Sequence, residues 1–144
     1  MKSVLVSACL LGEKCRYDGR SKPNEAVINK LKEYNVIPIC PEVMGGLSTP
    51  RNPSEIIGDK VIMINGRDVT LEYKRGAEIA LNIALKNKCE FAILKARSPS
   101  CGKGLIYDGT YSGTLTKGNG ICAELLMKNG IAVLDEEEIE KLDL

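Results

Sequence analysis

The sequence predicts a single α/β domain with a mostly parallel sheet of about four strands, helices on both faces and a small hairpin. Three observations lead to this prediction. Short apolar runs alternate along the chain with segments of helical periodicity, as in strand–helix–strand units with right-handed crossovers. The length of 144 residues suits one hydrophobic core. A hydrophobic content of 44% beside 27% charged residues is typical of a folded domain, so we expect residues 1–144 to form one domain.

Four apolar runs are the predicted strands. Each run is short, rich in Val, Ile, Leu or Phe, and bounded by polar or turn-forming residues. Pro38 in the second run favours an irregular or edge strand, because proline has no N–H group for the ladder. In chain order, the predicted strands are residues 4–8, 36–39, 91–94 and 131–134.

The segments between these runs show helical spacing. We expect a first helix over residues 25–34, which Asn35 ends in the left-handed conformation. Thr70 is expected to cap a long helix over residues 71–86. The apolar face expected for this long helix comprises Leu71, Ala77, Ala80, Leu81, Ala84 and Leu85.

The C-terminal part carries two further helix signals. Residues 120–128 are predicted to be helical up to the stop signal Asn129-Gly130. Asp135 and Glu138 have the spacing of a capping box, which predicts the start of a last short helix.

Three other segments are predicted to turn or to be irregular. Residues 41–53 contain three prolines and a Gly-Gly pair, which indicates a loop. Asn65-Gly66 is a strong two-residue turn signal, so residues 61–64 and 67–69 are predicted to form the hairpin. Residues 97–119 are rich in Gly and Ser, and so long a loop in a small domain indicates a functional segment.

The composition argues against several classes of partner. The formal net charge is +1 and aromatic residues make up 4%, so phosphate contacts and base stacking are poorly supplied. No run approaches the ~18 apolar residues that span a bilayer, and the apolar run near the N-terminus is short for a signal peptide. We expect a cytoplasmic protein that acts on a small molecule, without nucleic acid or membrane. The sequence does not indicate an oligomeric state.

The chain has six cysteines and no histidine. The lack of histidine excludes Ser-His-Asp and Cys-His catalytic groups together with histidine-liganded metal sites. In the reducing compartment expected for this chain, several cysteines indicate metal ligands or reactive thiols and not a disulfide framework.

Three of the cysteines follow predicted strands. Cys9 and Cys40 come directly after the first two strands, and Cys101 lies in the loop after the third. Parallel strands end at one edge of the sheet, where α/β proteins bind ligands, so we expect the three thiols to meet there. Three soft thiolates suit zinc, Cu(I) or an iron–sulfur cluster, with one coordination position left open. The absence of a C-x₂-C pair disfavours structural zinc, but the spacing does not distinguish a zinc–water site from a cluster.

The other three cysteines are interpreted separately. Cys89 and Cys122 stand beside apolar residues and are expected to be buried in the core. Cys15 lies close to Cys9 in the sequence, and its role stays open between a fourth ligand, a resolving thiol and no role.

Polar residues near these cysteines are candidate catalytic groups. Glu42 lies two residues after Cys40, and a carboxylate is the natural proton carrier in a site without histidine, although a solvated loop residue is an equal alternative. Ser98 and Ser100 precede Cys101, where a hydroxyl can bond a substrate or cap the loop. Four loop cations can hold an anionic group or be solvated: Arg16, Arg51, Lys95 and Arg97.

Five motifs in order extend over nearly the whole chain and resemble the thiouracil desulfidase family. They are Ser7-Ala8-Cys9-Leu10-Leu11-Gly12 with Arg16-Tyr17-Asp18-Gly19, Cys40-Pro41-Glu42 with Gly45-Gly46-Leu47, Thr49-Pro50-Arg51, Ser98-Pro99-Ser100-Cys101-Gly102 and Tyr107-Asp108-Gly109.

The resemblance implies a cofactor and a reaction. The cofactor is an oxygen-sensitive 4Fe–4S cluster held by Cys9, Cys40 and Cys101, with a fourth iron that the protein does not bind and that takes the sulfur of a thiocarbonyl substrate. The reaction is a desulfuration in sulfur metabolism, of hydrolase or lyase type, in which 2-thiouracil and water give uracil and hydrogen sulfide without net redox change. The catalytic residues implied are Glu42 and Ser98.

Two other functions remain open from the sequence. A non-catalytic iron–sulfur or metal-binding module could handle sulfur or sense redox state, and Cys15 as a fourth ligand would favour it. A metal-free thiol enzyme would use Cys101 as its nucleophile, but it would lack a histidine base.

Overall fold

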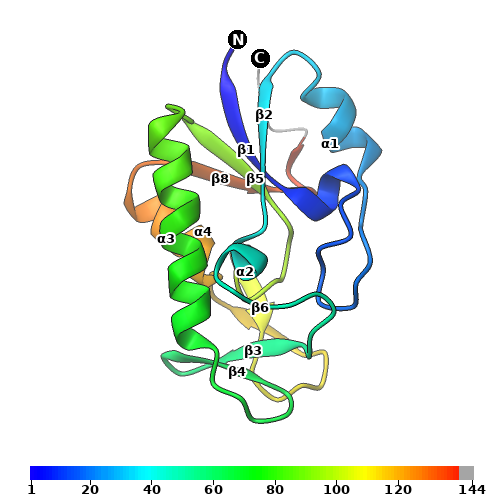
Figure 1. Cartoon of the computed structure of the whole chain (residues 1–144), viewed down its shortest axis with the longest axis vertical. Helices are drawn as coiled ribbons and strands as arrows, with labels where there is room; N and C mark the ends of the chain where they lie inside the picture. The colour runs from blue at the N-terminus through cyan, green and yellow to red at the C-terminus, as the bar shows by residue number, and fades with distance from the viewer. Residues whose placement is uncertain (140–144) are drawn as a thin grey trace.

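Four parallel strands form the central sheet in the order β2–β1–β5–β8 (Figure 1). The structure is a computed structural model, and it describes residues 1–139. The strands are β1 (Ser3–Ser7), β2 (Asn35–Ile39), β5 (Phe91–Leu94) and β8 (Ala132–Asp135). The predicted α/β class, the parallel sheet and its four strands are therefore confirmed. Pro38 lies on the edge strand β2, where its missing N–H group leaves no gap in the sheet interior.

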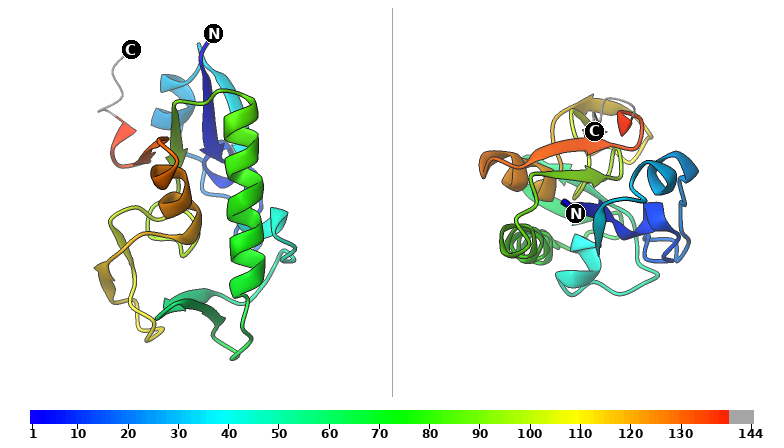
Figure 2. Two further views of the ribbon diagram at one scale, coloured as in Figure 1. Left: turned by 90° about the vertical axis from the view of Figure 1, so that its left-hand side faces the viewer. Right: turned by 90° about the horizontal axis from the view of Figure 1, so that it is seen from above.

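Helices cover both faces of this sheet (Figure 2). The helices α3 (Thr70–Lys86) and α4 (Ile121–Lys128) pack together on one face, and α1 (Glu25–Lys30) lies on the other. Side chains alternate along β1, so Leu5 joins the core under α3 and α4 while Val4 and Val6 join the core under α1.

The two helices predicted in the first half of the chain are present, but their ends and caps differ from the prediction. The helix α1 ends at Lys30, and Asn35 is not left-handed, because its N–H group bonds Lys2 O at 2.8 Å and pairs it into β2. Thr70 is the first residue of α3 and not its cap, since its hydroxyl accepts the N–H of Val61.

The predicted apolar face of α3 is partly wrong. Leu71 and Leu85 are 73% and 53% exposed. The buried residues of α3 are Tyr73, Gly76, Ala77, Ala80 and Ala84, so mostly small side chains bring this helix close to its neighbours.

The two segments predicted as loops contain regular structure. Residues 41–53 begin with the short helix α2 (Pro41–Met44), for which Pro41 supplies a favourable first position. Residues 97–119 contain a small antiparallel pair, β6 (Leu105–Tyr107) and β7 (Leu115–Lys117). A 3₁₀ helix, η1 (Ala8–Leu11), follows β1 directly.

The hairpin exists, but its strands differ from the prediction. The strand β4 (Lys60–Met63) pairs with β3 (Ser54–Ile57), which precedes it. The chain does turn back at Asn65-Gly66, where Met63 N–H bonds Arg67 O, but only an isolated bridge between Ile62 and Asp68 follows.

The C-terminal signals are confirmed where the structure describes them. Gly130 ends α4 with φ of 82°, and Asp135 and Glu138 form a reciprocal capping box. The last helix predicted to follow lies largely outside the described residues. Within residues 1–139, we find no helix with the length and apolar character needed to cross a membrane.

Two glycines allow α2 and α3 to pack in direct backbone contact. A Cβ atom on Gly76 would lie 1.8 Å from Pro41 O, and one on Gly45 would lie 1.9 Å from Glu72 O. No side chain fits at either place without moving the backbone of the neighbouring helix. This contact fixes the position of α2, which carries Glu42.

We expect the substitution Gly76→Ala to lower the free energy of unfolding by about 1–3 kcal/mol, because the added methyl group must push α2 away from α3. Urea unfolding measures this change. The control is Glu78→Ala on the exposed face of the same helix, with an expected change within about 0.5 kcal/mol. An equal, small effect for both variants would contradict the tight packing of the two helices.

Candidate active site

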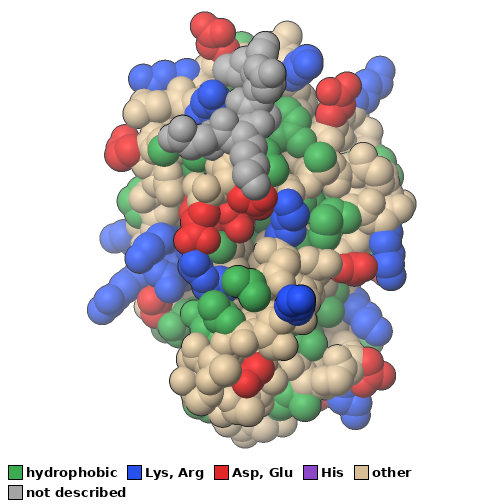
Figure 3. All heavy atoms as spheres, turned by 180° about the vertical axis from the view of Figure 1, so that it is seen from behind, with side chains coloured by type: hydrophobic (Ala, Val, Ile, Leu, Met, Phe, Trp, Pro, Cys, Tyr) green, Lys and Arg blue, Asp and Glu red, His purple; other side chains and the backbone are tan. Residues whose placement is uncertain are grey.

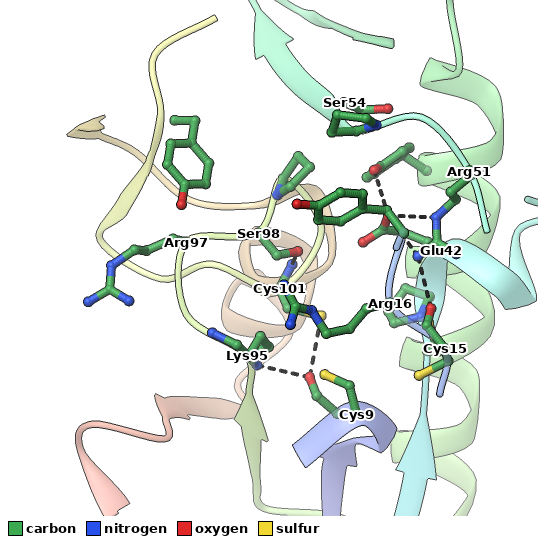
Figure 4. A pocket seen from close by; sticks show the side chains of 18 of the residues that line it. Cys9, Cys15, Arg16, Glu42, Arg51, Ser54, Lys95, Arg97, Ser98 and Cys101 are labelled. Carbon is green, nitrogen blue, oxygen red and sulfur yellow. Dashed lines mark hydrogen bonds and ion pairs between the residues drawn. The ribbon is translucent and has the colours of Figure 1, made fainter. Parts of the chain in front are cut away.

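A cavity of about 360 Å³ opens at the carboxyl edge of the sheet (Figure 4). Its walls come from the residues that follow β1, β2 and β5, from α2, and from the segments around the two hairpins. The residues after β1, β2 and β5 meet here because these three strands are neighbours and run in the same direction.

Cys9, Cys40 and Cys101 all line this cavity, as strand direction predicts. Cys9 lies in η1, Cys40 immediately precedes α2, and Cys101 lies in the turn after β5. Cys9 and Cys101 are only 7% and 5% exposed. All three are free thiols.

Burial and neighbouring groups keep the Cys40 and Cys101 thiols protonated. Burial, followed by the charges of Glu42 and Cys40, raises the pKa of Cys101 to about 12. Interaction with the Cys15 thiol, followed by burial, raises the pKa of Cys40. Such thiols become thiolates when a metal replaces their protons.

Cys15 also lines this cavity, and its thiol interacts with those of Cys9 and Cys40. Interaction with Cys40 lowers the pKa of Cys15, but interaction with Cys9 and burial outweigh it and raise the value to about 11. The backbone at this position is also held, because Cys15 O accepts hydrogen bonds from Arg51 Nη2 at 3.1 Å and from Cys40 Sγ at 3.7 Å. The other two cysteines, Cys89 and Cys122, are buried outside the cavity, as expected from their apolar neighbours.

The donor set fits an iron–sulfur cluster better than a single ion. A single zinc ion needs sulfur donors at about 2.3 Å from one point. Among residues 1–139, no group of three or more Cys, Asp or Glu side chains is placed to hold a metal ion. Thiols spread around a wider cavity, in a chain without histidine, suit a polynuclear group with soft ligands.

Glu42 also reaches this cavity, from the first turn of α2. Its Oε1 atom accepts hydrogen bonds from the Tyr73 hydroxyl at 2.8 Å and from Arg51 Nε at 3.2 Å. Burial and the charge of Glu42 raise the pKa of Tyr73, so Tyr73 stays protonated and donates. Both donors engage Oε1, and no described residue donates to Oε2.

The structure separates the two candidate serines. Ser98 lines the cavity, and its Oγ accepts the N–H groups of Ser100 at 3.0 Å and Cys101 at 2.9 Å. The hydroxyl proton of Ser98 is therefore left to donate toward the cavity. Ser100 is fully buried and does not line the cavity.

Three ion pairs tie the loop after β5 to the residues that follow β8. They are Lys95–Glu136 at 2.7 Å, Arg97–Glu137 at 2.7 Å and Lys103–Glu138 at 3.2 Å. Acidic and basic side chains accordingly meet on the back of the molecule (Figure 3). The sequence indicated Arg16, Arg51, Lys95 and Arg97 as candidate ligands for an anionic group. All four are paired with carboxylates in the structure, because Arg51 binds Glu42 and Arg16 binds Asp18 in addition to the pairs above.

Sequence reasoning missed Tyr73 and Ser7. Tyr73 meets Glu42 only because α3 packs on α2, so no spacing along the chain relates the two residues. Ser7 is the last residue of β1, and its hydroxyl lies 3.5 Å from Cys101 Sγ. The signals for Ser7 were its position two residues before Cys9 and its place at the start of the first motif.

Comparisons with known proteins agree with one another. A family model described as 2-thiouracil desulfurase matches residues 4–138. An uncharacterized protein of Bacillus subtilis (strain 168), YbbK, is 40% identical over 149 residues, which cover 96% of this chain and 99% of that protein. The solved structure of the [4Fe-4S]-dependent thiouracil desulfidase TudS is similar at a TM-score of 0.93 and 44% identity, covering 99% of this chain and 95% of the other.

Proposed function

The chain belongs to the 2-thiouracil desulfurase family, and from this membership we propose that it is a desulfidase that uses a 4Fe–4S cluster to remove sulfur from a thiocarbonyl small molecule such as 2-thiouracil. The observation that carries the proposal is the meeting of Cys9, Cys40 and Cys101 with Glu42 in one cavity. The similar structure of TudS, which is named as a [4Fe-4S]-dependent thiouracil desulfidase, supports it.

In this proposal Cys9, Cys40 and Cys101 hold the cluster, and one iron has no protein ligand. When bound, the cluster supplies a Lewis-acidic iron that can take the sulfur of the substrate. The overall reaction converts a C=S group and one water into a C=O group and hydrogen sulfide, so no electrons are exchanged with a donor.

Glu42 is proposed to move the protons of this reaction. Its Oε2 atom has no donor among the described residues and can accept a proton from the attacking water. Tyr73 and Arg51 hold the other oxygen, so the carboxylate has a fixed orientation toward the cavity.

Ser98 is proposed to orient the substrate. Two backbone N–H groups occupy its oxygen as an acceptor, which directs its hydroxyl proton to an acceptor in the cavity. The location proposed for the enzyme is the cytoplasm, because six free cysteines and an oxygen-sensitive cluster suit a reducing compartment.

The test is sulfide release by protein that has been reconstituted with iron and sulfide under anaerobic conditions. We expect 2-thiouracil to be converted to uracil with one sulfide released per uracil, without added reductant. Removal of iron with a chelator is expected to abolish the conversion. Equal conversion by iron-free protein would contradict the proposal and favour the thiol enzyme based on Cys101.

One observation favours a second candidate, a non-catalytic iron–sulfur module. Cys15 lines the same cavity, its thiol interacts with those of Cys9 and Cys40, and it could close the cluster as a fourth ligand. A desulfidase predicts that Cys15→Ala keeps both the iron and the conversion of 2-thiouracil. A module with four cysteine ligands predicts that this variant loses iron and that the parent protein converts no substrate.

A further inference from the structure

One buried hydroxyl lies next to the Cys101 sulfur and a second belongs to the residue before Cys101, and the proposed reaction uses neither of them. Ser7 Oγ lies 3.5 Å from Cys101 Sγ, and Ser7 is 2% exposed. Ser100 directly precedes Cys101 and is 0% exposed. The two hydroxyls come from different elements, the end of β1 and the turn after β5.

The hydroxyl of Ser7 has a defined direction. Its oxygen accepts the N–H group of Lys95 at 2.9 Å, which links the ends of β1 and β5 (Figure 4, dashed lines at Lys95 and Cys101). A serine hydroxyl has one proton to donate. Because the oxygen of Ser7 accepts the Lys95 N–H group, the Ser7 proton is directed to Cys101 Sγ.

The hydroxyl of Ser100 is an unpaired polar group in the core. Among residues 1–139, it is the one buried side-chain oxygen or nitrogen without a hydrogen-bond partner. It cannot turn to solvent, because the turn is fixed: Ser100 O accepts the N–H groups of Cys122 at 2.9 Å and Ala123 at 3.1 Å. Burial raises the pKa of Cys101 most, and the Ser7 and Ser100 hydroxyls oppose this increase, although no hydrogen bond joins Ser100 Oγ to Cys101 Sγ in this structure.

These two groups complement a thiolate and not a thiol. A thiol is a weak acceptor, whereas a metal-bound thiolate carries negative charge and accepts hydrogen bonds well. Buried donors without partners are unfavourable, so Ser100 is best satisfied when Cys101 is deprotonated. Hydrogen bonds to ligand sulfur also remove electron density from a cluster and raise its reduction potential.

We infer that Ser7 and Ser100 are positioning residues that donate hydrogen bonds to the Cys101 thiolate, hold it as a cluster ligand and set the reduction potential of the cluster. The inference rests on the proposed function for the presence of the cluster. In addition, it assigns two hydroxyl donors to Cys101, the most buried of the three proposed ligands. Among the described residues, no hydroxyl group donates to Cys9 or Cys40.

The experiment compares Ser7→Ala, Ser100→Ala and the double variant with Ser7→Thr, which keeps a hydroxyl. The matched control is Ser3→Ala, which removes a hydroxyl from the other end of β1, where it accepts a hydrogen bond from Asn35 Nδ2. Each anaerobically reconstituted protein is measured by redox titration followed by electron paramagnetic resonance, and by the rate at which a chelator removes iron. Thermal unfolding reports on the fold.

The alanine variants are expected to hold the cluster at a more negative potential and to lose iron about 10-fold faster. The double variant should exceed each single one, whereas Ser7→Thr and Ser3→Ala should match the parent protein. Folded Ser7→Ala and Ser100→Ala proteins with the parent's potential and iron loss would overturn the inference. A cluster that responds as expected in a protein without desulfidase activity would uphold the inference and overturn the proposed function. A parent protein that takes up no iron would overturn both.

Discussion

Replacing any one of Cys9, Cys40 and Cys101 with alanine is expected to abolish iron binding and desulfidase activity together. The reconstituted parent protein should contain about four iron and four sulfide per chain, and each variant should contain almost none. Each of the three thiols follows a different strand, so none of the three can take the place of another. Iron and acid-labile sulfide analysis measures the loss.

Cys89→Ala is the matched control for these variants. Cys89 is also buried, at 7% exposure, but it lies outside the cavity. This variant should retain iron and activity. Full iron content in any of the three cavity variants would show that the corresponding residue is not a ligand.

Glu42→Gln is expected to lower kcat by about 10²- to 10⁴-fold while the cluster stays bound. Glutamine keeps the shape of the side chain and can still meet the Tyr73 hydroxyl and Arg51, but it cannot accept a proton. The KM for 2-thiouracil should change little, because the cluster and Ser98 are proposed to hold the substrate. Steady-state kinetics beside iron analysis separates the two effects.

Tyr73→Phe serves as the comparison for Glu42→Gln. It removes one hydrogen bond from Oε1 and leaves the carboxylate intact, so a loss of about 10-fold in kcat is expected from poorer orientation. A Glu42→Gln enzyme as active as the Tyr73→Phe enzyme would contradict a proton-transfer role for Glu42.

The convergence of the cysteines was accessible from the sequence because it depends only on strand direction. Once Cys9, Cys40 and Cys101 each follow a parallel strand, they must reach one edge of the sheet. Burial of Cys89 and Cys122 followed from their apolar neighbours in the same way.

Features that depend on packing between distant segments were not accessible. Asn35 has the local preference of a helix stop, but pairing with β1 takes it into the sheet. The loop prediction for residues 41–53 relied on the content of proline and glycine. In the structure Pro41 instead starts the helix α2, and Gly45 allows α2 to pack closely against α3. Tyr73 and Glu42 meet only after α3 has packed on α2.

The separation of the three cysteines along the chain has a consequence for how the protein matures. During synthesis Cys9 leaves the ribosome long before Cys101, and the two come together only when β1 and β5 have paired. A zinc finger gathers its metal with neighbouring residues as it folds, but this chain must assemble its sheet first. In the proposed enzyme, cluster delivery is therefore a late event that requires a folded acceptor.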